Sequence, residues 1–347
     1  MLYKKEDIVF LFKQKDYVSC ERLEKGIHFD YNGLYYCCFF SHSNMNYVPI
    51  VKKINDTYKT LKMVEKVRKQ DIKILRSGKI PLRCQGCSQL KLKDWEDSSK
   101  IKYLSLTPNQ KCNSDCIYCT THRNKKYLNS LPDMKIYDIL EHLVKKNQIH
   151  SNCEIHIGGG EPTLHCEFSK IIDLFIENLK PQLKIYSSGI LYSETIEKAL
   201  KSGCCILSVS VDSGNSELYK QIKNVDKFDK VVQNLTKYAN SLPPNERILY
   251  IEMKYILLPN VNDTKEAILE FLELVKKVGN PSVRFDIDWN WLKSYKNDIK
   301  KRGEIFKTLK FVESECQKKS LSFCFYCEPK LLIEKYKDEY DSIIVDC

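Results

Sequence analysis

The sequence has no apolar run near the length needed to cross a bilayer, and residues 1–7 lack the pattern of a secretory signal. We therefore expect no membrane partner. The 347 residues include 16 cysteines. In a short secreted chain so many cysteines would suggest disulfides, but in a long chain with C-x2-C clusters they fit metal binding in a reducing compartment better. The sequence thus predicts a cytoplasmic protein.

A run of basic residues with interleaved aromatics, which is typical of nucleic-acid-binding surfaces, is also missing. The formal charge is +11, but the excess is mostly lysine scattered along predicted helix faces. We therefore do not expect nucleic acid as a partner. With 43% hydrophobic residues the chain can bury a full core, and its length exceeds the usual size of one domain. Two folding units are expected.

Three cysteines, Cys112, Cys116 and Cys119, stand close together in the run CNSDCIYC. Thiolates at this spacing can hold three corners of a cubane iron–sulfur cluster. Such clusters normally take four cysteines, so the fourth iron would be open to a small-molecule ligand. The alternative is a zinc site, for which His122 could supply the fourth ligand.

A second motif, GGGEPT at residues 158–163, follows an apolar stretch. Alone it could be a tight turn. At a strand end, however, its exposed backbone and the carboxylate of Glu161 can receive a charged amine. The cysteine triplet, with Tyr118 before its last cysteine, and the glycine run together resemble the radical S-adenosylmethionine (SAM) superfamily. The resemblance implies a [4Fe-4S] cluster held by Cys112, Cys116 and Cys119, and SAM bound to its open iron.

The resemblance also implies roles for single residues. Gly159, Gly160 and Glu161 would contact the SAM amino group, and Tyr118 would lie near the adenine. Polar residues at two further strand ends can meet the carboxylate and ribose of SAM, or else cap helices and form Asx turns. These residues are Ser188, Ser210 and Asp212.

The implied chemistry is a one-electron reaction. The reduced cluster passes an electron into a carbon–sulfur bond of SAM, and the resulting 5′-deoxyadenosyl radical abstracts hydrogen from the substrate. We therefore expect an electron donor such as flavodoxin or ferredoxin as a partner.

Alternating strand and helix patterns run from residue 100 onward. The expected strands are residues 101–107, 153–157, 183–187, 205–211, 248–257 and 282–288. The expected helices are residues 134–146, 168–180, 193–201, 216–240, 264–278 and 300–319. Such βα units specify an α/β fold with a parallel sheet, and its active residues lie at the carboxyl ends of the strands. Both motifs fall on that face. The resemblance implies the partial (β/α)6 TIM-type barrel of the family.

The first hundred residues are rich in cysteine. Cys20 is followed after twelve residues by Gly33 and after four more by Cys38, and the pair Cys84 and Cys87 comes later. This order resembles the start of a SPASM domain, or its shorter Twitch variant, although here it precedes the barrel and no cysteine follows between residues 88 and 111. The resemblance implies an auxiliary [4Fe-4S] cluster on these four cysteines.

Three alternatives stay open for this region. Cys37 competes with Cys38 as a ligand, the four cysteines could form a zinc ribbon, or they could be core residues. The stretch 27–36 predicts a β-hairpin with a type I′ turn at Asn32 and Gly33, which would place Cys37 or Cys38 at a strand end.

The chain is expected to have three parts: a small cysteine-rich domain over residues 1–98, the barrel over residues 99–322 and an extension over residues 323–347. The extension contains Cys324 and Cys327, which could complete the auxiliary site, donate a hydrogen atom to a substrate radical, or be half-buried strand residues. They are the candidate catalytic residues. Five further cysteines are expected to be small core residues: Cys153, Cys166, Cys204, Cys205 and Cys316.

The expected function is that of a radical SAM oxidoreductase or maturase that oxidises or crosslinks a peptide or a sugar-like substrate, assisted by the auxiliary cluster. We find no leader-peptide-binding domain ahead of Cys20, which weakens the peptide option. One alternative is a radical SAM epimerase in which a residue such as Cys327 donates hydrogen. The alternative of another class is a zinc-stabilised nucleic-acid-binding protein.

Overall fold

The computed structural model describes residues 16–37, 49–52, 56–85, 87, 89–95, 100–119, 133–288, 298–326 and 328–343. The chain divides into two compact units. The first unit takes Met1–Asn109, Pro132–Ile157 and Asp173–Leu183. The second takes Gln110–Leu131, Gly158–Ile172 and Lys184–Cys347. Cys38, His122 and Cys327, which the sequence analysis singled out, lie outside the described residues.

The first unit is built on a short sheet with the strand order β6-β5-β2-β3. The strand β2 pairs in parallel with β5, β5 pairs in parallel with β6, and β3 pairs antiparallel with β2. A separate antiparallel pair is formed by β1 and β4. The elements of the first unit are β1 (Asp16–Ser19), α1 (Glu21–Lys25), β2 (Gly26–Asp30), β3 (Gly33–Tyr35), α2 (Thr57–Arg76), η2 (Leu82–Cys84), β4 (Lys91–Asp94), β5 (Ile101–Thr107), α4 (Tyr137–Lys145) and β6 (Ile149–Ile157).

The predicted hairpin is confirmed, but its turn is not the one expected. Asp30 pairs with Gly33, so the two loop residues are Tyr31 and Asn32, one position earlier than predicted. Neither has a positive φ, as a type I′ turn requires, so that turn type is wrong. Gly33 instead allows the backbone of Val51 to approach closely. It has φ +150°, and a Cβ there would lie 2.2 Å from the carbonyl oxygen of Val51.

The sequence places a domain boundary after residue 98, whereas the structure pairs strands across it. Because β2 and β5 are neighbours in one sheet, the residues on the two sides of that position share a hydrophobic core. Phe29 of β2 is fully buried, as are Leu104 and Leu106 of β5. The first compact unit also continues to Asn109.

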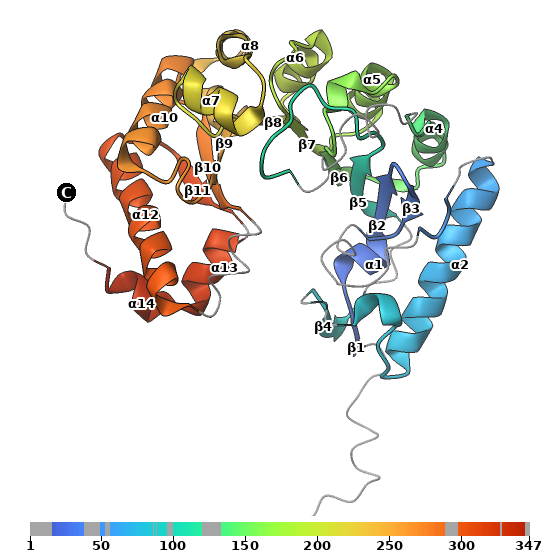
Figure 1. The fold of residues 1–347 in the computed structure, drawn as a ribbon. Helices are drawn as coiled ribbons and strands as arrows, with labels where there is room; N and C mark the ends of the chain where they lie inside the picture. The colour runs from blue at the N-terminus through green and yellow to red at the C-terminus, as the bar shows by residue number, and fades with distance from the viewer. Residues whose placement is uncertain are drawn as a thin grey trace, which may run out of the picture. The chain divides into compact units, whose positions relative to one another are not determined.

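The second unit is built on a sheet with the strand order β7-β8-β9-β10-β11, of which β8 to β11 pair in parallel (Figure 1). The helix α5 begins in the second unit and ends in the first, and the strand β7 begins in the first unit and ends in the second. The elements are η3 (Pro162–Leu164), α5 (Phe168–Asn178), β7 (Gln182–Ser187), α6 (Glu194–Lys201), β8 (Cys205–Ser210), α7 (Ser216–Lys223), α8 (Phe228–Asn240), α9 (Pro244–Tyr250), β9 (Ile251–Leu257), α10 (Lys265–Val278), β10 (Ser282–Ile287), α12 (Ile299–Lys318), β11 (Phe323–Phe325), α13 (Glu328–Lys335) and α14 (Lys337–Asp341).

Aromatic packing holds α10 against this sheet. The ring centroid of Phe271 in α10 lies 4.7 Å from that of Tyr255 in β9, and Tyr255 lies 5.6 Å from Phe285 in β10. All three side chains are fully buried. Burying an aromatic side chain removes 150–250 Å² of surface from water, which makes such residues dominant in the core energetics.

Strands and helices alternate from β5 to β11, so the predicted α/β class with a parallel sheet is confirmed. Two predicted elements need correction. Residues 248–250 end α9 instead of opening a strand, because Pro243 and Pro244 start a short helix there. The predicted helix 216–240 is two helices, since Asn224 adopts the left-handed conformation with φ 52° and ends α7. Among the helices of the described residues, none has the length and apolar character to span a membrane.

Candidate cofactor site

The loop that carries Cys112, Cys116 and Cys119, called the cysteine loop below, lies in the second unit. The Sγ atoms of Cys112 and Cys116 lie 3.4 and 3.7 Å from the buried hydroxyl oxygen of Ser114, so one hydroxyl links the two thiols. The N–H of Cys119 donates to the carbonyl of Cys116 at 3.0 Å. Burial raises the pKa of Cys112, while hydrogen bonds to Ser114 lower it. The loop therefore gathers half-buried thiols, which a metal would bind in their deprotonated form.

The carboxyl end of α7 holds this loop in place. The N–H of Asp115 donates to the carbonyl of Lys223, and that of Ile117 donates to the carbonyl of Ile222, both at 2.9 Å. The side-chain amide of Asn224 donates to the carbonyl of Asp115 at 2.9 Å. The last carbonyls of a helix have no partner within it, so the loop satisfies them. Sequence reasoning missed this contact, although an asparagine at a helix end is a known stop signal.

A buried ion pair lies directly behind the loop. Lys223 and Asp212 form it, and both side chains are almost fully buried. The Tyr118 hydroxyl donates to Oδ2 of Asp212 at 2.6 Å, and the backbone N–H of Ile256 donates to Oδ1 at 2.7 Å. Both oxygens of this carboxylate are therefore engaged within the second unit. Asp212 has φ 62°, so a strained residue is held by several bonds at once.

Charge and burial act against each other in this pair. Burial lowers the pKa of Lys223, but the negative charge of Asp212, and then that of Cys116, outweighs it, so the pKa stands above its ordinary value. Burial, and then the charge of Asp212, raises the pKa of Tyr118 well above its ordinary value. The lysine is therefore charged and the phenol is a hydrogen-bond donor. The Tyr118 ring also packs on an apolar cluster: Ile222, Ile256 and Leu258.

The glycine run closes onto the start of the cysteine loop. The N–H of Glu161 donates to the carbonyl of Lys111 at 2.7 Å. A Cβ on Gly160 would lie 2.1 Å from that same carbonyl oxygen, so no other residue fits without moving the loop. Gly159 is exposed and has φ +99°, a conformation that favours glycine.

Replacing Gly160 with alanine should therefore displace the residues before Cys112. We expect a loss of about 1–3 kcal/mol in the free energy of unfolding, the usual cost of overpacking, and weaker retention of iron. Gly303 is the matched control, because a Cβ there meets nothing within 4 Å. In the helix α12 the change Gly303→Ala should stabilise by roughly 1 kcal/mol. Chemical denaturation of both variants checks this, and equal behaviour of the two would contradict it.

The carboxylate of Glu161 ties the glycine run to the end of β7. It accepts hydrogen bonds from the hydroxyl of Thr163 at 2.8 Å, the hydroxyl of Ser187 at 3.0 Å and the N–H of Ser188 at 2.7 Å. The hydroxyl of Ser188 donates to Oδ1 of Asn113, within the cysteine loop, at 2.8 Å. The carboxylate is almost fully buried. Glu161 and Ser188 thus join the glycine run, β7 and the cysteine loop.

The predicted SAM contacts lie around these elements. Ser210 is half-buried at the last position of β8, in register with Lys254. Three further polar atoms are buried without a hydrogen-bond partner among the described residues: Gln110 Oε1, Asn113 Nδ2 and Tyr219 Oη. Gln110 and Asn113 flank Cys112. Burial, and then the charge of Cys116, raises the pKa of Tyr219, so its hydroxyl lies within electrostatic range of that thiol.

Unpartnered buried polar groups cost about 1–3 kcal/mol each, so the second unit has donors and acceptors left for a bound polar group. The three thiols, the glycine run and these orphaned atoms fit an iron–sulfur cluster with a polar metabolite beside it. The contacts of Tyr118, Gly159, Gly160, Glu161, Ser188, Ser210 and Asp212 with SAM stay predictions.

Three cysteines of the first unit, Cys20, Cys84 and Cys87, influence one another electrostatically. Cys20 and Cys84 are buried and Cys87 is half-buried. Burial, with a smaller contribution from the charge of Cys87, raises the pKa of Cys20 to about 11. Burial raises the pKa of Cys84 to about 12, with Cys20 next in effect. These thiols are thus within electrostatic range of each other. Cys37 is buried two residues after β3, and an auxiliary cluster stays a prediction.

The remaining cysteines divide into core and surface residues. Cys153, Cys205 and Cys316 are fully buried as predicted. Cys204 is half-buried and Cys166 is exposed, so the predicted core role is wrong for these two. Cys166 lies just beyond η3, where the chain leaves the glycine run.

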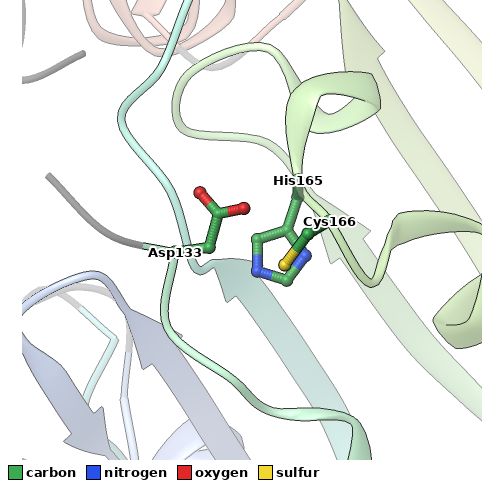
Figure 2. A group of neighbouring side chains, drawn as sticks. All are labelled: Asp133, His165 and Cys166. Atoms are coloured by element: carbon green, nitrogen blue, oxygen red, sulfur yellow. The ribbon is translucent and has the colours of Figure 1, made fainter. Parts of the chain in front are cut away.

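Figure 2 shows Cys166 next to His165 on the turn that follows η3. His165 is buried, and its Nδ1 accepts the N–H of Glu167 at 3.2 Å. Asp133, the third residue in Figure 2, belongs to the first unit, and we assign no site to the three residues.

Comparison with known proteins adds three findings. Residues 106–283 match the family model described as the radical SAM superfamily. The chain is 27% identical over 176 residues to a GTP 3′,8-cyclase of Haemophilus influenzae, which is 50% of each chain. It is 25% identical over 217 residues to a probable GTP 3′,8-cyclase of Methanocaldococcus jannaschii, which is 62% of this chain and 72% of that one. The chain spans about half the length of the Haemophilus relatives that it matches.

Among solved structures, Streptococcus suis SuiB bound to the precursor peptide SuiA aligns with a TM-score of 0.52 at 14% identity. The alignment covers 93% of this chain and 75% of SuiB. At this identity the likeness shows the fold alone. The family match, by contrast, spans both the cysteine triplet and the glycine run, and more than half of the chain. The chain therefore belongs to the radical SAM superfamily.

Proposed function

We propose that this protein is a radical SAM enzyme that oxidises or crosslinks a peptide, with one auxiliary [4Fe-4S] cluster in its first unit. Proteins of this superfamily bind a [4Fe-4S] cluster and SAM. The observation that carries the proposal is the cysteine loop of the second unit. It is bonded at once to the end of α7, the glycine run and the end of β7, and buried polar atoms beside it lack partners.

Cys112, Cys116 and Cys119 would hold the cluster, and the residues of the glycine run and the ends of β7 and β8 would surround SAM. When bound, these cofactors supply a 5′-deoxyadenosyl radical that takes hydrogen from the substrate. The protein's part is positional. Glu161 fixes β7 against the glycine run, and Lys223 with Asp212 fixes the loop from behind. Fixing groups in advance is how a protein lowers the entropic cost of a reaction.

A peptide is the proposed substrate because the fold match to SuiB, solved with its precursor peptide, covers nearly the whole chain. We propose a flavodoxin or ferredoxin as electron donor and the cytoplasm as the compartment, since reduced clusters need a reducing environment. The direct test is to supply SAM and a strong reductant to anaerobically purified protein. Release of 5′-deoxyadenosine is expected, and a colourless protein that contains zinc at the triplet would overturn the proposal.

Epimerisation is a second candidate reaction, favoured by the position of Cys324. Its thiol is exposed on β11, in register with Arg284 of β10. A thiol there could return a hydrogen atom to a substrate radical. Turnover in D2O separates the two reactions, because epimerisation places solvent deuterium in the product, whereas oxidation or crosslinking removes hydrogen without replacing it.

The auxiliary cluster makes a separate prediction. The double change Cys84→Ala and Cys87→Ala should lower the iron content from about eight to about four atoms per chain, since each cubane holds four. Release of 5′-deoxyadenosine should persist, because the triplet is intact, while product should be lost. Iron analysis and absorption spectra measure this. Cys166→Ala, at an exposed cysteine, is the control and should keep all the iron. Unchanged iron in the double variant would show that the auxiliary site is wrong.

A further inference from the structure

One face of the second unit's sheet carries charged and polar side chains at alternate positions. Lys254 of β9 is in register with Ser210 of β8 and Arg284 of β10, and Arg284 is in register with Cys324 of β11. The intervening residues of the same strands, such as Met253 and Phe285, are fully buried in the core. Two cations therefore stand side by side on neighbouring strands, a pairing that is destabilising unless anions offset it.

The anions on this face are already shared. Glu252 accepts hydrogen bonds from Lys184 Nζ at 2.8 Å and from the hydroxyl of Ser208 at 2.6 Å. Asp286 lies 3.4 Å from Nη2 of Arg284 and 3.5 Å from Nζ of Lys254. Burial lowers the pKa of Lys254, and the charge of Arg284 opposes the effect of Asp286. One carboxylate thus serves two cations.

Arg284 keeps open hydrogen-bond donors. Its side chain is 5% exposed, and neither Nε nor Nη1 has a hydrogen-bond partner among the described residues. Nη1 lies 3.7 Å from Oε1 of Glu252, which is too far for a hydrogen bond. The guanidinium stacks on the ring of Tyr326, with its carbon 3.2 Å from the ring centroid. The stacking fixes the orientation of a charged group whose Nη2 donates to Asp286, while its Nε and Nη1 have no hydrogen-bond partner among the described residues.

Solvent reaches this cluster from the side of β11. The side chains of Lys184, Lys254 and Asp286 are 16%, 17% and 15% exposed. Cys324 and Tyr326 are exposed. Solvent therefore reaches the residues around Arg284, while its Nε and Nη1 atoms are themselves buried, so a ligand reaches them when a neighbouring side chain moves aside.

We propose that Arg284, fixed by Tyr326 and flanked by Lys254, binds a carboxylate of the substrate. The inference rests on the proposed function, because it takes the substrate to be a peptide. An open N–H group on a fixed cation suits a carboxylate oxygen, and a charge-assisted bond of this kind is about twice as strong as a neutral one. A phosphate dianion would bring a second negative charge next to Asp286 and Glu252. The carboxylate is either an acidic side chain or the carboxyl terminus of the peptide.

Binding of three tripeptide probes to cluster-loaded protein tests this, measured by calorimetry without turnover. Ac-Ala-Glu-Ala-NH2 has only a side-chain carboxylate, Ac-Ala-Gln-Ala-OH has only a terminal one, and Ac-Ala-Gln-Ala-NH2 has neither. We expect one of the first two to bind about tenfold more tightly than the neutral probe, as one charged hydrogen bond gives. The tighter probe identifies the source of the carboxylate.

The preference should vanish in Arg284→Gln. Lys300→Gln, at an exposed lysine of α12, makes the same charge change and should keep it. Tyr326→Leu retains every charge but removes the stacked ring, and it should weaken the preference several-fold. If Arg284→Gln fails to fold, the binding preference of Tyr326→Leu is the test of the carboxylate site.

Equal binding of all three probes, or a preference that survives in the Arg284 and Tyr326 variants, overturns the carboxylate site. Failure of the site can be told from failure of the proposed function. If the protein discriminates between the probes but releases no 5′-deoxyadenosine, the carboxylate site stands and the proposed function is refuted. Release of 5′-deoxyadenosine without discrimination between the probes does the reverse.

Discussion

Replacing Cys116 with alanine should abolish the release of 5′-deoxyadenosine from SAM. The sulfur of Cys116 and that of Cys112 both lie beside the hydroxyl of Ser114, and Cys116 is the middle ligand of the proposed set. With two thiolates left, a cubane would lack two protein ligands instead of one. We expect a drop of at least about a hundredfold in 5′-deoxyadenosine, together with loss of about four irons per chain.

The measurement is anaerobic incubation with dithionite and SAM, followed by chromatography and iron analysis. Cys204→Ala is the matched control, because Cys204 is half-buried in the same unit and its sulfur lies 2.9 Å from the hydroxyl oxygen of Ser202, which is not part of the loop. That variant should release 5′-deoxyadenosine at the rate of the unchanged protein. Undiminished release with Cys116→Ala would remove the triplet from the cofactor site.

The change Asp212→Asn should lower the free energy of unfolding by about 3–5 kcal/mol, because it leaves Lys223 charged and buried without its partner. The pair is almost fully buried and also receives the hydroxyl of Tyr118 and the N–H of Ile256. Because Lys223 provides a carbonyl to Asp115 in the cysteine loop, we expect iron retention to fall as well. Chemical denaturation and iron analysis of the variant measure both effects.

The control is an ion pair of the same residue types on the surface. Lys220 and Asp226 lie 3.0 Å apart, with side chains 62% and 72% exposed. Exposed pairs contribute about 0–1 kcal/mol, so Asp226→Asn should have little effect. The double change Asp212→Asn with Lys223→Met should be less harmful than Asp212→Asn alone, since it removes the unpaired charge. A similar small loss for Asp212→Asn and Asp226→Asn would contradict the structural role of the buried pair.

The local features of the site were predictable from sequence, because each is contained in a short run. The cysteine triplet, the glycine run and the strand β5 come from residue types at fixed spacings, and β5 has the predicted bounds. Contacts between distant residues could not be predicted in this way. Tyr118 meets Asp212 across 94 positions, and nothing in either local sequence indicates the other.

The errors have the same physical origin. Residues 216–240 have one continuous helical pattern, and the break at Asn224 becomes clear once the cysteine loop is seen to bond to the helix end. Similarly, β2 has the local signature of a hairpin, but its pairing with β5 is set by a core shared between segments far apart in sequence. Arg284 was not singled out, because a lone arginine in a strand looks ordinary until its neighbours on three other strands are known.

The left-handed turn at Asn224 constrains how the chain can change in length. On the amino-terminal side of Asn224, the rotation of α7 about its axis is fixed relative to the cysteine loop, because Ile222, Lys223 and Asn224 all bond to that loop. One inserted residue there would rotate the helix end by about 100° and carry those groups away. Toward its carboxyl side, residues 225–227 merely lead into α8. Insertions, labels or reporter tags are therefore tolerable after Asn224 and disruptive before it.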